Sequence, residues 1–169
     1  MKRSLYIGLV LANLLLVLAV VNGAILRKQG IVEAGRRVVL KLAPVDPRSL
    51  MQGDYMVLNY ALSRDQDFGK AAEETRGHVV LSLGENDEGT FNRIGVGGEV
   101  GEDEAVLNYR KWRRGFRFGI ESFFFEEGSA DRYQRARYAE LRVSDGGEAV
   151  IVNLLEDDFS VIDSMESEN

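Results

Sequence analysis

The sequence lacks cysteine altogether and contains only two prolines and one histidine, His78, among its 169 residues. Without cysteine the chain forms no disulfide and carries no thiolate chemistry, which is compatible with an oxidising compartment. With one histidine, a metal site would have to rely on carboxylates. The pairs Glu126–Glu127 and Asp157–Asp158 are neighbours in sequence without convergent ligand spacing. We therefore expect no metal site and no cofactor.

Basic residues are also in the minority, since 21 lysines and arginines face 27 acidic residues and the net charge is −6. A general nucleic-acid binder is normally basic, so we expect no nucleic-acid partner. The length is sufficient for one domain with a hydrophobic core plus an appendage.

The appendage is a run without any charged residue from Ser4 through Leu26. It is long enough to cross roughly 30 Å of hydrocarbon as a helix. A cleaved signal peptide is the alternative, with a small-residue site before Ala24, but the run exceeds the usual apolar region of about 7–15 residues. We favour a retained anchor at 5–26, after a short tail at 1–4 and before a linker or helix extension at 27–35.

The remainder is predicted to be mainly β, as a small antiparallel barrel or sandwich with one short helix in a domain at 36–155. Short apolar runs alternate with turns such as Ser144–Gly147, which is a hairpin signal. Acidic residues without a basic one fill 156–169, which we interpret as a frayed tail. The expected strands are 38–42, 56–62, 78–83, 90–96, 105–112, 116–125, 140–143 and 149–154, and the expected helix is 129–139.

A turn followed by a strand forms the most distinctive segment. Pro47 fixes its own φ and biases Asp46 towards extended geometry, and Arg48 follows them. Gly53 then permits a positive φ or a close backbone approach before the strand begins at Asp54. Alternation places one set of side chains on one face and the other set, opened by Tyr55, on the opposite face. The first set is Met56, Leu58, Tyr60 and Leu62.

Two interpretations of this segment remain open. In the first, Asp54 caps the turn and the tyrosines pack in the core with bonded hydroxyls. In the second, Asp46, Arg48, Asp54 and Tyr55 form a recognition site on one rim.

The stretch Gly53-Asp54-Tyr55-Met56-Val57-Leu58-Asn59-Tyr60 resembles the signature of the GDYXXLXY proteins at every specified position. This resemblance implies a bacterial membrane-anchored envelope protein, in a family whose biochemical activity is not established and which lends no catalytic residue. Family members often lie beside genes for multi-pass membrane proteins. The stretch Phe118–Gly128 also resembles the family and includes Glu121, a further candidate for the site.

Orientation does not follow from charge, because basic residues flank both ends of the apolar run. A very short N-terminal tail with a signal-anchor is the usual bacterial arrangement, and the resemblance points the same way. We expect an inner-membrane protein with its soluble domain in the periplasm.

A basic segment with interleaved aromatic residues is the other candidate surface. It contains Arg110, Lys111, Arg113, Arg114 and Arg117. Such a segment suits an anionic lipid surface or a cell-wall polymer, although a charged, solvated edge strand is the simpler interpretation.

The function that we expect is binding or assembly, as an accessory to a multi-pass membrane protein, and no catalytic residue is predicted. The alternatives are an envelope hydrolase with a carboxylate pair, Asp54 and Glu121, and a binder of lipid headgroups or polymer through the Arg110–Arg117 strand. The balance favours a non-enzymatic protein.

Overall fold

The computed structural model describes residues 2–43, 55–95, 100–113, 115–126 and 128–162. Its first element is a long helix, α1 (Lys2–Ala34), and short strands follow. Two short α-helices and two 3-10 helices connect some of these strands, namely α3 (Gln66–Ala71), α4 (Ala130–Tyr133), η1 (Ala61–Arg64) and η2 (Glu85–Asp87). The strands are β1 (Arg36–Lys41), β2 (Tyr55–Val57), β3 (Arg76–Leu83), β4 (Gly89–Ile94), β5 (Glu104–Trp112), β6 (Gly115–Arg117), β7 (Ser122–Phe124), β8 (Tyr138–Val143) and β9 (Ala149–Leu155).

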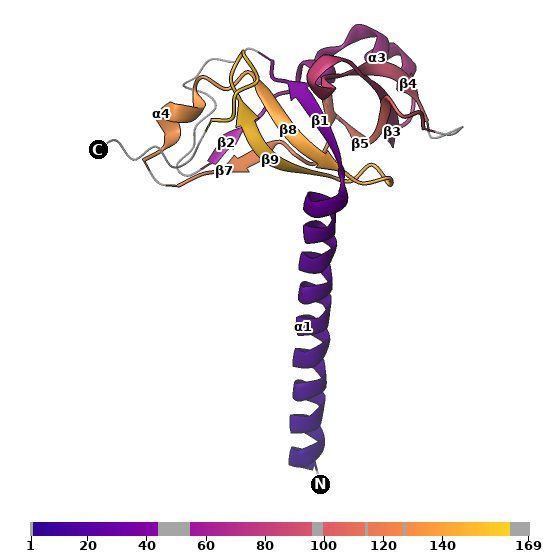
Figure 1. Ribbon diagram of the computed structural model, residues 1–169. Helices are drawn as coiled ribbons and strands as arrows, with labels where there is room; N and C mark the ends of the chain where they lie inside the picture. Colours follow the sequence, from indigo (N-terminus) through magenta and orange to yellow (C-terminus); the bar gives the residue numbers. More distant parts are fainter. Residues whose placement is uncertain (1, 44–54, 96–99, 114, 127, 163–169) are drawn as a thin grey trace.

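Within the described residues the strands form three sheets, with orders β1-β8-β9, β2-β7 and β4-β3-β5-β6. Every pairing of two named strands is antiparallel. The four-stranded sheet is curled and lies beside the β1-β8-β9 sheet, while α1 projects from the domain as a single stalk (Figure 1). A mainly antiparallel β domain behind an N-terminal apolar helix was predicted from the sequence, and this fold class is confirmed.

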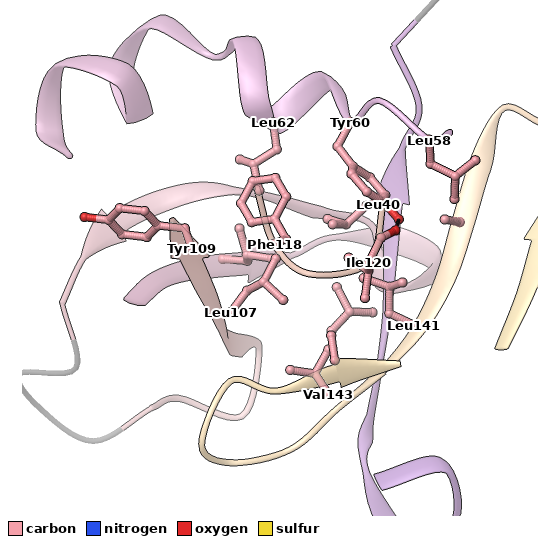
Figure 2. Packing of buried hydrophobic residues seen from close by; sticks show 14 of the residues in the cluster. Leu40, Leu58, Tyr60, Leu62, Leu107, Tyr109, Phe118, Ile120, Leu141 and Val143 are labelled. Carbon is pink, nitrogen blue, oxygen red and sulfur yellow. Dashed lines mark hydrogen bonds between the residues drawn. The ribbon is translucent and has the colours of Figure 1, made fainter. Parts of the chain in front are cut away.

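The two larger sheets share one hydrophobic core. Leu40 from β1, Leu81 from β3 and Leu141 from β8 are each no more than 1% exposed. Figure 2 shows Leu40, Tyr60 and Ile120 close together in this core, with Leu107 of β5 on the opposite side. The apolar alternation of each strand supplies these side chains, since every second residue faces inward.

The helix α1 and the β domain are joined without a linker. α1 continues to Ala34, and the Gly35 N–H donates to the Ile31 carbonyl oxygen at 2.8 Å just before β1 begins. Ile31 is only 6% exposed because this end of α1 packs against β8 and β9. The Lys28 ammonium also lies 2.8 Å from the Glu148 carboxylate in the β8–β9 turn. The domain is therefore held against the C-terminal end of α1.

The predicted strand 116–125 is wrong as a single element. Gly119 adopts a φ of +82°, and the chain turns between β6 and β7. Its inward alternation still holds, because Phe118 and Ile120 are buried.

The helical predictions were partly wrong as well. α4 covers only Ala130–Tyr133 of the predicted 129–139, and α3 was not predicted. α3 has a readable signal, since Asp65 caps it by accepting from the Asp67 and Phe68 amides at 2.9 Å. Phe68 is fully buried against four aromatic rings.

The prediction of a frayed tail from Glu156 onward is wrong for the segment 156–162, which is packed on the domain. Ile162 is 8% exposed in the core and its N–H donates to the Leu154 carbonyl oxygen at 2.9 Å. The Phe159 ring stacks on Tyr138 at a centroid distance of 4.5 Å. Apolar residues spaced among the acidic ones therefore attach this segment to the domain.

Candidate functional site

The buried half of the signature strand builds the core. Leu58 and Tyr60 are 2% and 1% exposed, and Met56 and Leu62 share their inward face. The Leu58 N–H donates to the Glu121 carbonyl oxygen at 2.8 Å. The predicted strand 56–62 is wrong beyond Val57, because β2 ends there and the chain enters η1 at Ala61. The four side chains expected to face inward are nevertheless all buried.

The hydroxyl of Tyr60 donates a 2.6 Å hydrogen bond to the Ile120 carbonyl oxygen. Burial, and then the negative charge of Glu121, raise the pKa of Tyr60 well above its ordinary value. This tyrosine therefore remains neutral and fastens the signature strand to the β6–β7 turn, as the structural interpretation of the motif required.

The turn residues of the motif lie outside the described residues. These are Asp46, Pro47, Arg48, Gly53 and Asp54. Their role as a recognition rim stays a prediction.

Tyr55 marks the outward half of the motif. It pairs with Phe124 across the β2–β7 ribbon, and the two ring centroids are 5.7 Å apart. Phe124 is 74% exposed. Its neighbours Phe123 and Phe125 pack instead on Tyr133 at the end of α4, with centroid distances of 5.1 and 5.3 Å. The ribbon thus has one face turned to the core and one aromatic face turned outward.

A groove of about 620 Å³ opens where β6 leaves β5 and the chain turns towards β7. It brings Arg110 and Arg117 of the predicted basic segment together with Glu121, a candidate from the stretch Phe118–Gly128. Its other lining residues are Arg76, Gly77, His78, Asn108, Tyr109, Phe118 and Gly119. The site therefore depends on pairing between β3, β5 and β6.

Glu121 has a structural role in this groove. Its carboxylate accepts hydrogen bonds from the backbone amides of Phe118 and Gly119, and it caps the turn that Gly119 makes. The turn at Gly119 separates Glu121 from β6, so Glu121 and Arg117 do not lie on one continuous strand. A hydrolase would need this carboxylate for proton transfer, and these two amides already engage one of its oxygens.

The predicted basic segment does not form one continuous patch. Arg110 and Arg117 pair directly across β5 and β6, and the Arg117 guanidinium lies 4.7 Å from the centroid of the Trp112 ring. Lys111 belongs to the opposite face, where its ammonium donates to the Ala72 carbonyl oxygen at 3.0 Å. Arg113 is exposed in the following turn with a φ of +50°, and Arg114 lies outside the described residues.

Two groove residues, Arg76 and His78, were not predicted as site residues. Both lie on β3, and their register opposite Arg110 and Asn108 is set by a pairing more than 25 residues away in sequence. No local sequence pattern predicts this pairing between β3 and β5. The described residues include no cluster of three or more side chains of the types that ligate metals.

Comparisons with known proteins give one positive result. No curated protein matches the chain, and no solved structure does. The model of the GDYXXLXY protein family matches residues 17–154, which span the second half of α1 and nearly the whole β domain. This match covers the signature strand, the groove and both larger sheets, and the chain therefore belongs to the GDYXXLXY protein family.

Proposed function

We propose that this chain is a membrane-anchored binding module that assembles with a multi-pass membrane protein. The observation that carries the proposal is the exposed aromatic face of the β2–β7 ribbon. Phe124 exposes 74% of its surface beside Tyr55, although neighbouring phenylalanines are turned into the core. Exposed aromatic side chains of this kind are enriched where proteins dock, because they bury a large area at small entropic cost.

The position of the ribbon favours a partner at the membrane. In Figure 1, β7 lies along the edge of the domain from which α1 leaves, and α4 lies on the other side of β7. Since Phe123 packs on Tyr133 of α4, strand alternation directs Phe124 away from that contact. A partner with membrane-spanning helices would meet both this aromatic face and α1.

The anchor offers the second contact. Its candidate span, Tyr6–Ala34, contains an 18-residue window with a mean hydropathy of 2.5, and no residue of that window is buried. Asn13 lies within this apolar span, where a polar amide gains from a partner helix. We place the domain in the periplasm, with the anchor in the inner membrane.

The test is photocrosslinking in intact membranes from a photoreactive residue at position 124 or 55, followed by mass spectrometry of the adducts. The matched control is position 90, because Thr90 is exposed on β4 in the other sheet. We expect one dominant multi-pass protein from positions 124 and 55 and none from position 90. The same adducts from all three positions, or none from any, would contradict the proposal.

A substitution separates docking from folding. Phe124→Ser removes only an exposed ring, so we expect a folded protein that has lost the adduct formed from position 55. Phe123→Ser removes a ring that packs on Tyr133 and should unfold the ribbon. A full yield of adduct from the folded Phe124→Ser variant would show that the aromatic face is not the docking edge.

A further inference from the structure

Three arginines stand at one register of three neighbouring strands. Arg76 of β3 is paired with Arg110 of β5, which is paired in turn with Arg117 of β6. All three are exposed and line the groove described above. Directly opposed side chains have Cβ atoms about 4.5–5.5 Å apart, and like charges in such positions repel one another. We call Arg76, Arg110 and Arg117 the arginine row.

The row has no carboxylate partner among the described residues. Other arginines of the chain are paired, including Arg37 with Glu140 and Arg93 with Glu104. No such ion pair involves the row, although acidic residues outnumber basic ones by 27 to 21 in the whole chain. The Glu121 carboxylate beside the row is bonded to the amides of Phe118 and Gly119. The Glu121 carboxylate therefore stabilises the turn and, within the described residues, forms no ion pair with the arginine row.

The next register of the same face adds further polar groups. His78 lies opposite Asn108, two pairs along from Arg76 and Arg110, and both side chains are half-buried in the groove. Strand alternation places all four side chains on one face of the sheet. A guanidinium offers a fork of donors that matches the oxygens of a phosphate, and imidazole and amide groups add further donors. Repulsion within the row would fall once such an anion neutralised it.

The groove also lies close to the membrane end of the domain. The Asn108 N–H donates to the Gly147 carbonyl oxygen at 2.9 Å, in the β8–β9 turn. The next residue, Glu148, forms the ion pair with Lys28 of α1. Two short contacts therefore connect the groove to the point where the anchor helix meets the domain.

We propose that the arginine row and its groove bind a phosphate group, supplied either by the headgroup of an anionic phospholipid or by a soluble phosphate. Arg110 is the central phosphate-binding residue, and Arg76 and Arg117 flank it. His78 and Asn108 lie beside the row on the same face of the sheet. This site differs from the predicted basic segment in two ways. It does not include Lys111, and it includes residues of β3. It is independent of docking through the β2–β7 ribbon.

The single tryptophan of the chain reports on this site, because the Arg117 guanidinium lies 4.7 Å from the centroid of the Trp112 ring. The full chain is placed in nanodiscs of phosphatidylcholine, and Trp112 emission is followed while inorganic phosphate is added. A second preparation contains phosphatidylglycerol and receives no phosphate. A saturable change with inorganic phosphate identifies a soluble ligand, and a change on adding phosphatidylglycerol identifies a lipid ligand. Unchanged emission in both preparations would overturn the proposal.

Arg110→Gln is the test variant, and Arg135→Gln is the matched control with the same loss of charge on an exposed arginine that pairs only with Glu156. We expect binding to Arg110→Gln to be roughly tenfold weaker or more, and binding to Arg135→Gln to be unchanged. Arg110→Gln should also unfold at an equal or higher temperature without phosphate, because it removes repulsion within the row. Equal losses of affinity in both variants would show only a general effect of charge and would refute the site.

Discussion

At the scale of single residues, Tyr60 shows how the signature acts through a buried polar group. Tyr60→Phe removes the 2.6 Å hydrogen bond and leaves the Ile120 carbonyl oxygen unsatisfied in the core. We expect the free energy of unfolding to fall by about 1–2 kcal/mol. Urea unfolding of the detergent-solubilised chain, followed by tryptophan fluorescence, measures this change.

Tyr109→Phe is the control, because Tyr109 is 4% exposed but its hydroxyl has no hydrogen bond within the described structure. Figure 2 shows this hydroxyl pointing away from the core cluster. Its removal should cost less than the removal of the Tyr60 hydroxyl. Equal losses for the two variants would contradict the role assigned to Tyr60.

The lowered pKa of the Glu140 carboxyl group makes the stability of the fold depend on pH. Burial tends to raise the pKa of Glu140, but hydrogen bonds from Asn153 at 2.9 Å and from Arg37 at 2.8 Å outweigh burial and lower it. A depressed pKa stabilises the folded state above the ordinary carboxyl value. This contribution is lost as the pH falls towards the lowered pKa of the folded protein.

We therefore expect Glu140→Gln to lower the free energy of unfolding at neutral pH by about 1–3 kcal/mol. Its stability should then decline less than that of the natural protein between about pH 5 and pH 3. Glu104, whose pKa is lowered to about 2 by Arg93, titrates in both proteins, so their difference isolates Glu140. Urea unfolding at a series of pH values tests this, and parallel pH profiles would refute it.

At the scale of elements, the junction of α1 with β1 depends on one glycine. A Cβ at Gly35 would lie 2.3 Å from the Ile31 carbonyl oxygen and 3.1 Å from the Val143 backbone. Gly35→Ala should therefore displace α1 from β8 and lower the free energy of unfolding by about 1–3 kcal/mol. Hydrogen exchange at the start of β1, together with urea unfolding, measures both effects.

Gly30→Ala is the matched control, because a Cβ at Gly30 in the same helix meets no atom within 4 Å. It should leave stability unchanged or raise it by up to about 1 kcal/mol, since alanine favours the helix. A Gly35→Ala protein as stable as Gly30→Ala would show that the junction tolerates a side chain.

The two missed features of the β domain also belong to this scale. The run 116–125 alternates as a strand should, yet the chain breaks because the Glu121 carboxylate and the positive φ of Gly119 stabilise a turn. The helix α3 is shorter than the window over which helical periodicity can be recognised. Only its cap at Asp65 was visible in the sequence.

At the scale of the whole molecule, the continuity of α1 predicts that the anchor is retained. Cleavage before Ala24 would cut within a helix that runs unbroken from Lys2 to Ala34 and packs on the domain at Ile31. We expect the membrane fraction to contain the intact chain of 18.9 kDa. Intact-mass spectrometry decides this, and a species that begins at Ala24 would contradict it.

The amino-acid sequence by itself determined the long N-terminal apolar helix, the mainly antiparallel β class and the inward-facing residues of the signature segment. These features follow from local quantities, namely the length of an uncharged run, turn residues and alternation with a period of two. The resemblance to the family also rests on a short contiguous sequence motif.

Only the tertiary structure decided which residues meet at a surface. The arginine row requires the register of β3, β5 and β6, and the aromatic face requires Phe124 to lie opposite Tyr55. Strand register is set by packing between distant segments, and a shift of one residue would turn each side chain to the other face. Because the register depends on pairing between distant segments, the proximity of Arg76 and Arg110 could not be predicted from the sequence.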